Sequence, residues 1–106
     1  MGNPVRPVCL FNAQALTTSY VQSPTFDAEN FSEVILHLKA ATYGAYYNVL
    51  AWIDPSQVET LQANQTLAAG ATVHITITDP WPFIAISVKT QSNGSAGTIT
   101  AFVNGK

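Results

Sequence analysis

Two histidines are the residues of this 106-residue chain best suited to bind a metal or move a proton. His37 and His74 each fall on the polar side of an alternating stretch, and imidazole is a common zinc ligand. A zinc site would require the two stretches to meet and a carboxylate such as Glu33 or Asp79 to join them. We interpret both histidines as solvent-facing side chains and predict no metal and no other cofactor.

The carboxylates could supply acid–base chemistry, but they are dispersed along the chain. No two of them stand out as an acid and base pair, and no Ser-His-Asp set places its nucleophile on a recognisable tight turn. Asp27 and Glu29 share a polar loop that could bind calcium weakly, although two acids in such a loop are usually only part of the loop. We therefore predict that the chain is not an enzyme. The carboxylates are Asp27, Glu29, Glu33, Asp54, Glu59 and Asp79.

Cys9 is the single cysteine, so the chain can form neither an intrachain disulfide nor a cysteine-based metal site. We predict that it is a buried thiol in the first strand. The segment from Met1 to Arg6 has no apolar h-region, and no apolar run approaches the ~18 residues of a membrane span. We expect a protein that folds in a reducing cytoplasm and has no membrane partner.

The surface of the folded chain must be unusually neutral. Only 9 % of the residues are charged, against about 25 % in a typical protein. The formal net charge is −2 and the four cations are scattered, whereas binding to nucleic acid needs clustered Lys or Arg. We exclude a nucleic-acid partner and expect this surface to be covered in an assembly.

Alternation of apolar and polar residues is the main structural signal, and its period of two indicates β-strands. It is clearest over residues 31–40, where Val34, Leu36, Leu38 and Ala40 share one side, and over residues 72–78. Pro24 makes the second predicted strand an edge or bulged strand. Residues 58–67 show a less regular pattern, which predicts one short strand at most. The other predicted strands are 8–14, 20–26, 46–54, 83–91 and 98–103. We expect Ile75, Ile77 and Ile99 to point inward and Phe102 to point outward.

About seven or eight short strands separated by turn signals, with no convincing helix, are typical of an all-β sandwich or barrel. We predict an antiparallel β-sandwich, jelly-roll- or Ig-like, because strands with one apolar face need a facing sheet. The single domain covers residues 8–106. Residues 1–7 form an extended N-terminal arm, since Pro4 and Pro7 disfavour regular structure.

The aromatic residues between Tyr43 and Trp81 are the best candidates for a binding surface. Tyr and Trp bury a large area while keeping one polar atom, which suits both core packing and protein interfaces. Flat exposed rings could also stack on sugars. These three alternatives stay open from the sequence. The predicted interface residues are Pro4, Val5, Arg6, Pro7, Tyr43, Tyr46, Trp52 and Trp81.

The pattern of turns and apolar positions resembles small β-sandwich virion proteins of tailed bacteriophages. The resemblance is carried by Leu10-Phe-Asn-Ala-Gln-Ala-Leu16, Phe31-Ser-Glu-Val-Ile-Leu-His-Leu38, Phe83-Ile-Ala-Ile-Ser-Val88 and the last strand from Gly97 to Val103. Members of this group often have an Asp-Gly-x-x-Trp turn, which Asp54 to Thr60 lacks. The resemblance implies a protein of the capsid or the tail that works by packing.

Our hypothesis is a capsid decoration (cement) protein that bridges neighbouring subunits of a phage shell. Its expected partners are the major capsid protein or other virion subunits. It would be a homo-oligomer, for which a trimer fits, located in the virion and assembled in the host cytoplasm. One alternative is a carbohydrate-binding module with Trp52 and Tyr46 as its platform, and another is a tail or baseplate component.

Overall fold

The computed structural model of the chain describes residues 7–79, 81–91 and 97–106, and its regular structure there consists of β-strands. No helix in these ranges is long and apolar enough to cross a membrane. The strands are β1 (Val8–Ala15), β2 (Val21–Gln22), β3 (Phe26–Asp27), β4 (Val34–Ala41), β5 (Ala45–Trp52), β6 (Glu59–Leu67), β7 (Thr72–Ile77), β8 (Phe83–Thr90) and β9 (Thr98–Gly105).

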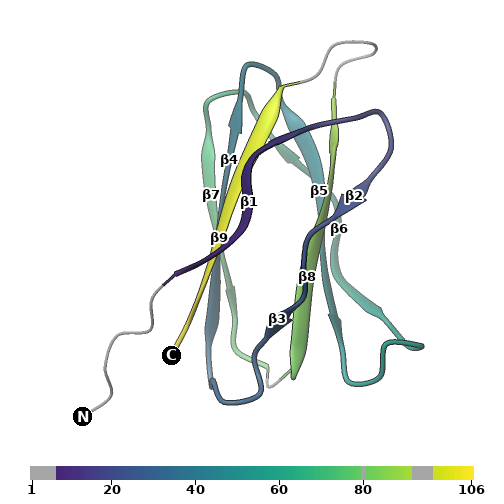
Figure 1. The fold of residues 1–106 in the computed structure, drawn as a ribbon, viewed down its shortest axis with the longest axis vertical. Helices are drawn as coiled ribbons and strands as arrows, with labels where there is room; N and C mark the ends of the chain where they lie inside the picture. The colour runs from purple at the N-terminus through teal and green to yellow at the C-terminus, as the bar shows by residue number, and fades with distance from the viewer. Residues whose placement is uncertain (1–6, 80, 92–96) are drawn as a thin grey trace.

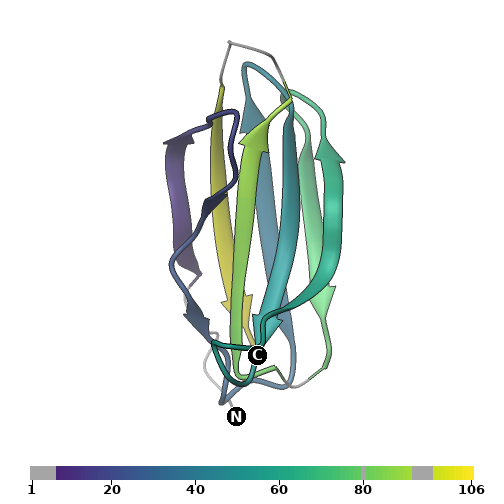
Figure 2. The ribbon, with the colours of Figure 1, turned by 90° about the vertical axis from the view of Figure 1, so that its right-hand side faces the viewer.

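The strands form two antiparallel sheets that face each other (Figure 1). One sheet has four strands in the order β1-β9-β4-β7. The other has the order β2-β8-β5-β6, and β3 pairs with the same strand as β2, namely β8. Figure 2 shows β8, β5 and β6 in front of the four-stranded sheet. The predicted antiparallel β-sandwich is confirmed.

The order of the strands decides between the two sandwich types that the sequence left open. With β2 and β3 taken as one interrupted strand, there are eight strands. The connection from β5 to β6 stays within one sheet, and every other connection between successive strands crosses from one sheet to the other. Eight strands wound in this way form a jelly roll.

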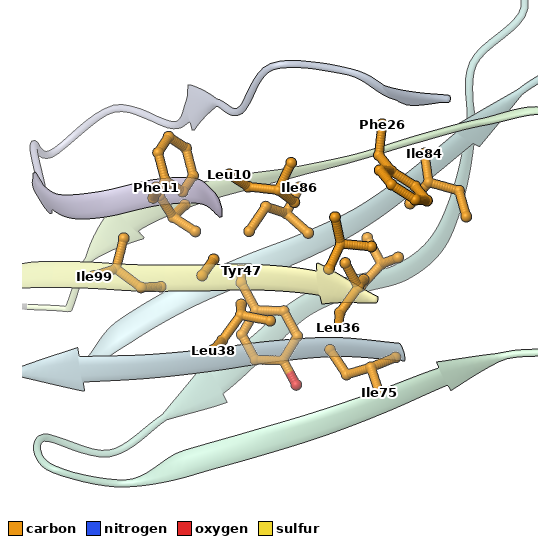
Figure 3. Packing of buried hydrophobic residues seen from close by; sticks show 14 of the residues in the cluster. Leu10, Phe11, Phe26, Leu36, Leu38, Tyr47, Ile75, Ile84, Ile86 and Ile99 are labelled. Carbon is orange, nitrogen blue, oxygen red and sulfur yellow. The ribbon is translucent and has the colours of Figure 1, made fainter. Parts of the chain in front are cut away.

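The inner faces of the two sheets form one hydrophobic core (Figure 3). Alternation places every second side chain of a strand between the sheets. The four central strands therefore supply the largest fully buried side chains, which are Leu36, Leu38, Val49, Ile84, Ile86, Val88, Ile99 and Val103.

The outer strands are less regular than the central ones. The pairing of β1 with β9 shifts register twice, and Ala13 in β1 has a φ of 49°. The predicted edge strand over residues 20–26 is two short strands, interrupted around Pro24. Proline has no N–H to donate, so the ladder to β8 breaks there.

Two predicted segments differ from the structure. Residues 59–67 form a nine-residue strand, although the sequence predicted at most a short one. Its polar residues are tolerated because β6 lies at the edge of its sheet, where one face and one side meet water. The predicted strand over residues 46–54 ends at Trp52, and Ile53 beyond it is 73 % exposed.

The prediction of a buried Cys9 is wrong, because the residue is exposed. Cys9 is opposite Phe102 in the ladder between β1 and β9, and opposed residues share one face of a sheet. Phe102 points outward, as the sequence predicted, so Cys9 points outward too. The register shift that follows brings Leu10 and Phe11 into the core in succession.

Candidate interaction surfaces

The outer face of the five-stranded sheet carries most of the aromatic residues outside the core. Tyr46, Asn48, Leu50 and Trp52 alternate along the outer face of β5, and the first three are half-buried. Trp52 is only 7 % exposed, because its ring stacks on Phe83 of β8 with ring centroids 6.2 Å apart. Trp52 and Tyr46 therefore do not form the flat exposed platform that sugar stacking would need.

A cation holds two tyrosines together on the same face. The Lys89 Nζ lies 4.7 Å from the centroid of the Tyr20 ring and 5.6 Å from that of Tyr46, which is within the range of cation–π attraction. The Tyr20 hydroxyl donates a hydrogen bond of 2.6 Å to Oδ1 of Asn64 on β6. Tyr20 thus connects the β2 side of the sheet to β6.

Amides and a hydroxyl complete this surface. Asn48 donates from Nδ2 to Oγ of Ser87 at 3.0 Å, and its Oδ1 accepts from the backbone N–H of Asn64 at 2.8 Å. These bonds are within one sheet and need no ligand. Tyr20, Tyr46, Asn48, Asn64 and Lys89 are thus linked to one another on this face, and these five residues include no carboxylate, histidine or cysteine.

Two of the predicted interface residues, Tyr43 and Trp81, lie at opposite ends of the sandwich. Tyr43 lies in the turn between β4 and β5 and is 40 % exposed, whereas Trp81 precedes β8 at the opposite end of the sandwich (Figure 1). Pro4, Val5 and Arg6 lie outside the described residues, and with them the predicted arm except for Pro7, which is exposed.

Exposed apolar side chains gather near Trp81. Ile53 and Val58 are exposed in the connection from β5 to β6, and an open depression of about 270 Å³ is lined by Ile53, Asp54, Gln57, Glu59 and Trp81. Hydrogen bonds from the backbone N–H and the hydroxyl of Ser56 hold the pKa of the Asp54 carboxyl below its usual value. The described residues that line this depression are thus apolar, acidic or amide side chains.

The two predicted solvent-side histidines are neighbours on the outer face of the four-stranded sheet. His37 of β4 is directly opposite His74 of β7 on one side and Phe102 of β9 on the other. An open depression of about 360 Å³ is lined by Pro7, His37 and Phe102. The sequence alone could not predict that the two histidines lie opposite each other, because β4 and β7 are far apart along the chain and their pairing is not a local property.

The carboxylate that a zinc site was expected to need is not beside the histidines. Glu33 lies 3.8 Å from the Lys106 Nζ, and Asp79 lies beyond the end of β7, among the residues that line another depression. Within the described residues no group of three or more His, Cys, Asp or Glu is placed to hold a metal ion. The carboxylate of Asp27, considered for calcium, accepts a hydrogen bond of 3.1 Å from the backbone N–H of Glu29.

The open side of the sandwich between β6 and β7 is a feature that the sequence did not reveal. A depression of about 250 Å³ there reaches side chains of both sheets, among them Val49, Leu61, Ile75 and Ile77. The alternation of residues 72–78 was visible in the sequence, but their position at an edge depends on which strands pair.

Comparison with known proteins supports the fold. No protein-family model matches the sequence, and no curated protein matches it. Among solved structures, the chain is similar to one described by the words "Bacillus endospore appendages form a novel family of disulfide-linked pili", with a TM-score of 0.60 and 10 % identity over 99 % of this chain and 91 % of that one. At this identity the similarity concerns the fold alone.

Proposed function

We propose that the chain is a structural protein that works by packing against other protein subunits in an assembly. Its low content of charge supports this, because fewer ions must lose their water at a protein contact. Large apolar side chains exposed on several sides support it as well, namely Val8, Tyr43, Ile53, Val58 and Phe102. The solved structure of similar fold is described in terms of disulfide-linked pili, which are also protein assemblies.

The observation that carries the proposal is the β7 edge. A sheet edge with unpaired backbone groups is a template for another strand, and soluble proteins usually protect it with bulges, proline or charge. At the other edges, β1 is shifted twice in register, β2 and β3 are interrupted, and β6 is bulged with Asn64 at a φ of 51°.

Strand β7 has none of these protections. Its six residues pair with β4 in continuous register from Lys39–Thr72 to Val34–Ile77. The strand contains no proline and no Asp, Glu, Lys or Arg, and among the described residues it pairs with β4 alone. Its residues have high β-propensity. A strand of another subunit added here would continue the four-stranded sheet and cover the depression between the sheets.

The finer proposal is a virion protein of a tailed phage, most simply a decoration protein bound to capsid subunits. It rests on the sequence resemblance, and the β7 edge and neutral surface fit the bridging role. The assembly would be non-covalent in the main, because one cysteine per 106 residues allows each chain one interchain disulfide at most. A polymer linked through disulfides would need two per subunit.

The test is the mass of the untagged chain by light scattering over a concentration series. We expect oligomers for the wild type and a shift toward monomer for Thr72→Lys/Thr76→Lys, because lysine on an edge strand opposes the addition of another strand. The matched control, Thr60→Lys/Gln65→Lys, places the same charge on exposed positions of β6 and should keep the oligomer.

Two results would contradict the proposal at different levels. A wild-type chain that stays monomeric at every concentration, and that binds no other subunit, argues against a structural role. An oligomer that both double variants retain argues against β7 as the contact.

For the finer proposal, mass spectrometry of particles from a host carrying this gene should find the chain in a fixed ratio to the major capsid protein. Its absence from particles would refute a virion role.

A further inference from the structure

The chain has two histidines in 106 residues, and the fold places them in direct contact. His37 and His74 are opposite each other in the β4–β7 ladder. Their ring centroids are 4.5 Å apart and the ring planes meet at 67°. The hydrogen-bonded strands on which both residues lie hold the two imidazoles together.

The imidazole nitrogens are available to a ligand. His74 is exposed and His37 is half-buried, and the hydrogen bonds found in the described part of the chain include none to either ring. The open depression beside His37 gives access from solvent. A paired imidazole without a hydrogen-bond partner can offer a lone pair to a metal.

We propose that His37 and His74 together bind one divalent transition-metal ion of the copper, nickel and zinc group. Metal–imidazole bonds of about 2.0–2.1 Å require two ligating nitrogens roughly 3 Å apart. The ring centroids are 4.5 Å apart, so the proposal requires the two rings to turn about their side-chain bonds until one nitrogen of each reaches that distance. Imidazole favours these metals over calcium and magnesium, and copper(II) should bind most tightly. The remaining coordination positions are open to water or to a group of a partner.

Among the described residues, the surroundings provide no third protein ligand. On the same face, the positions next to the histidines along β4 and β7 are Ile35, Lys39, Thr72 and Thr76. Lys39 weakens the binding of a cation. Cys9 faces the same way but is separated from His37 by the β9 strand with Phe102, so it lies about two strand spacings, or ~9.6 Å, away.

Calorimetric titration of the untagged chain with copper(II) and with zinc tests the site. We expect one metal per chain, and NMR should show the imidazole signals of both histidines changing together. His37→Gln or His74→Gln should each weaken binding by roughly 100-fold, because two linked ligands bind far more tightly than one.

A relocated histidine provides the matched control. His74→Thr/Gln65→His keeps two histidines but moves one to an exposed position of the other sheet, and it should bind as weakly as His74→Thr. Circular dichroism verifies that each variant is folded. Wild-type affinity in the relocated variant or in either single variant, or one metal per two chains, would overturn the site. The inference is independent of the proposed assembly, because it concerns one ladder within one chain.

Discussion

Tyr47 shows how one inward-facing residue makes the fold sensitive to pH. It is on the inner face of β5 and is 4 % exposed, and burial raises the pKa of its phenol above the usual 10.0. A raised pKa in the folded state means that the folded chain keeps a proton which the unfolded chain loses. The stability that this supplies is present below the ordinary tyrosine pKa and is lost as the pH rises beyond it.

We predict that Tyr47→Phe reduces the loss of stability above pH 10, the usual range of tyrosine ionisation. Urea unfolding at several alkaline pH values measures the free energy of unfolding for each variant. The control is Tyr43→Phe, which removes the hydroxyl of an exposed tyrosine and should leave the pH dependence of the wild type. An unchanged alkaline slope in Tyr47→Phe would show that other groups cause the loss.

Among the structural elements, the interruption between β2 and β3 depends on a side chain that replaces part of the ladder. Ser23 is buried and precedes Pro24. Its Oγ accepts a hydrogen bond of 3.0 Å from the N–H of Ile86 on β8 and donates one of 2.9 Å to the carbonyl of Pro24. The serine thus satisfies a backbone donor of a central strand at the point where the edge strand breaks.

Ser23→Ala should lower the free energy of unfolding by about 1–3 kcal/mol, because it leaves the buried N–H of Ile86 without its partner. Chemical denaturation measures the change, and Ser19→Ala, at an exposed position, is the control. A cost in Ser23→Ala no greater than that of the control would mean that the strand rearranges to pair Ile86.

The whole molecule is a neutral, two-layered body with few ions on its surface. With four cations and six anions in 106 residues, long-range electrostatic attraction between copies is weak. In the assembly that we propose, the contacts would therefore come from backbone pairing and apolar contact, neither of which salt screens.

We predict that self-association changes little between about 0.05 M and about 0.5 M sodium chloride, a range over which screening of exposed charges becomes nearly complete. Sedimentation at a fixed protein concentration measures the distribution of oligomers. Dissociation of the oligomer as salt is added would contradict assembly through neutral surfaces and indicate that its few ion pairs hold it together.

The sequence by itself determined where most of the strands lie along the chain and which way their side chains face. Alternation is a local property, so Leu36 and Leu38 in β4, Ile75 and Ile77 in β7, and Ile99 in β9 were all correctly predicted to point inward. Charge content was also available without a structure, and with it the expectation of a neutral surface.

Only the tertiary structure decided what depends on pairing between distant segments. The register shifts of β1 turned Cys9 outward, the edge position of β6 allowed a polar nine-residue strand, and stacking on Phe83 buried Trp52. The contact of His37 with His74 and the unprotected edge of β7 arise in the same way. Alternation with a period of two shows which face of a sheet a residue occupies. Which residue lies opposite it on the next strand depends on how the whole chain folds.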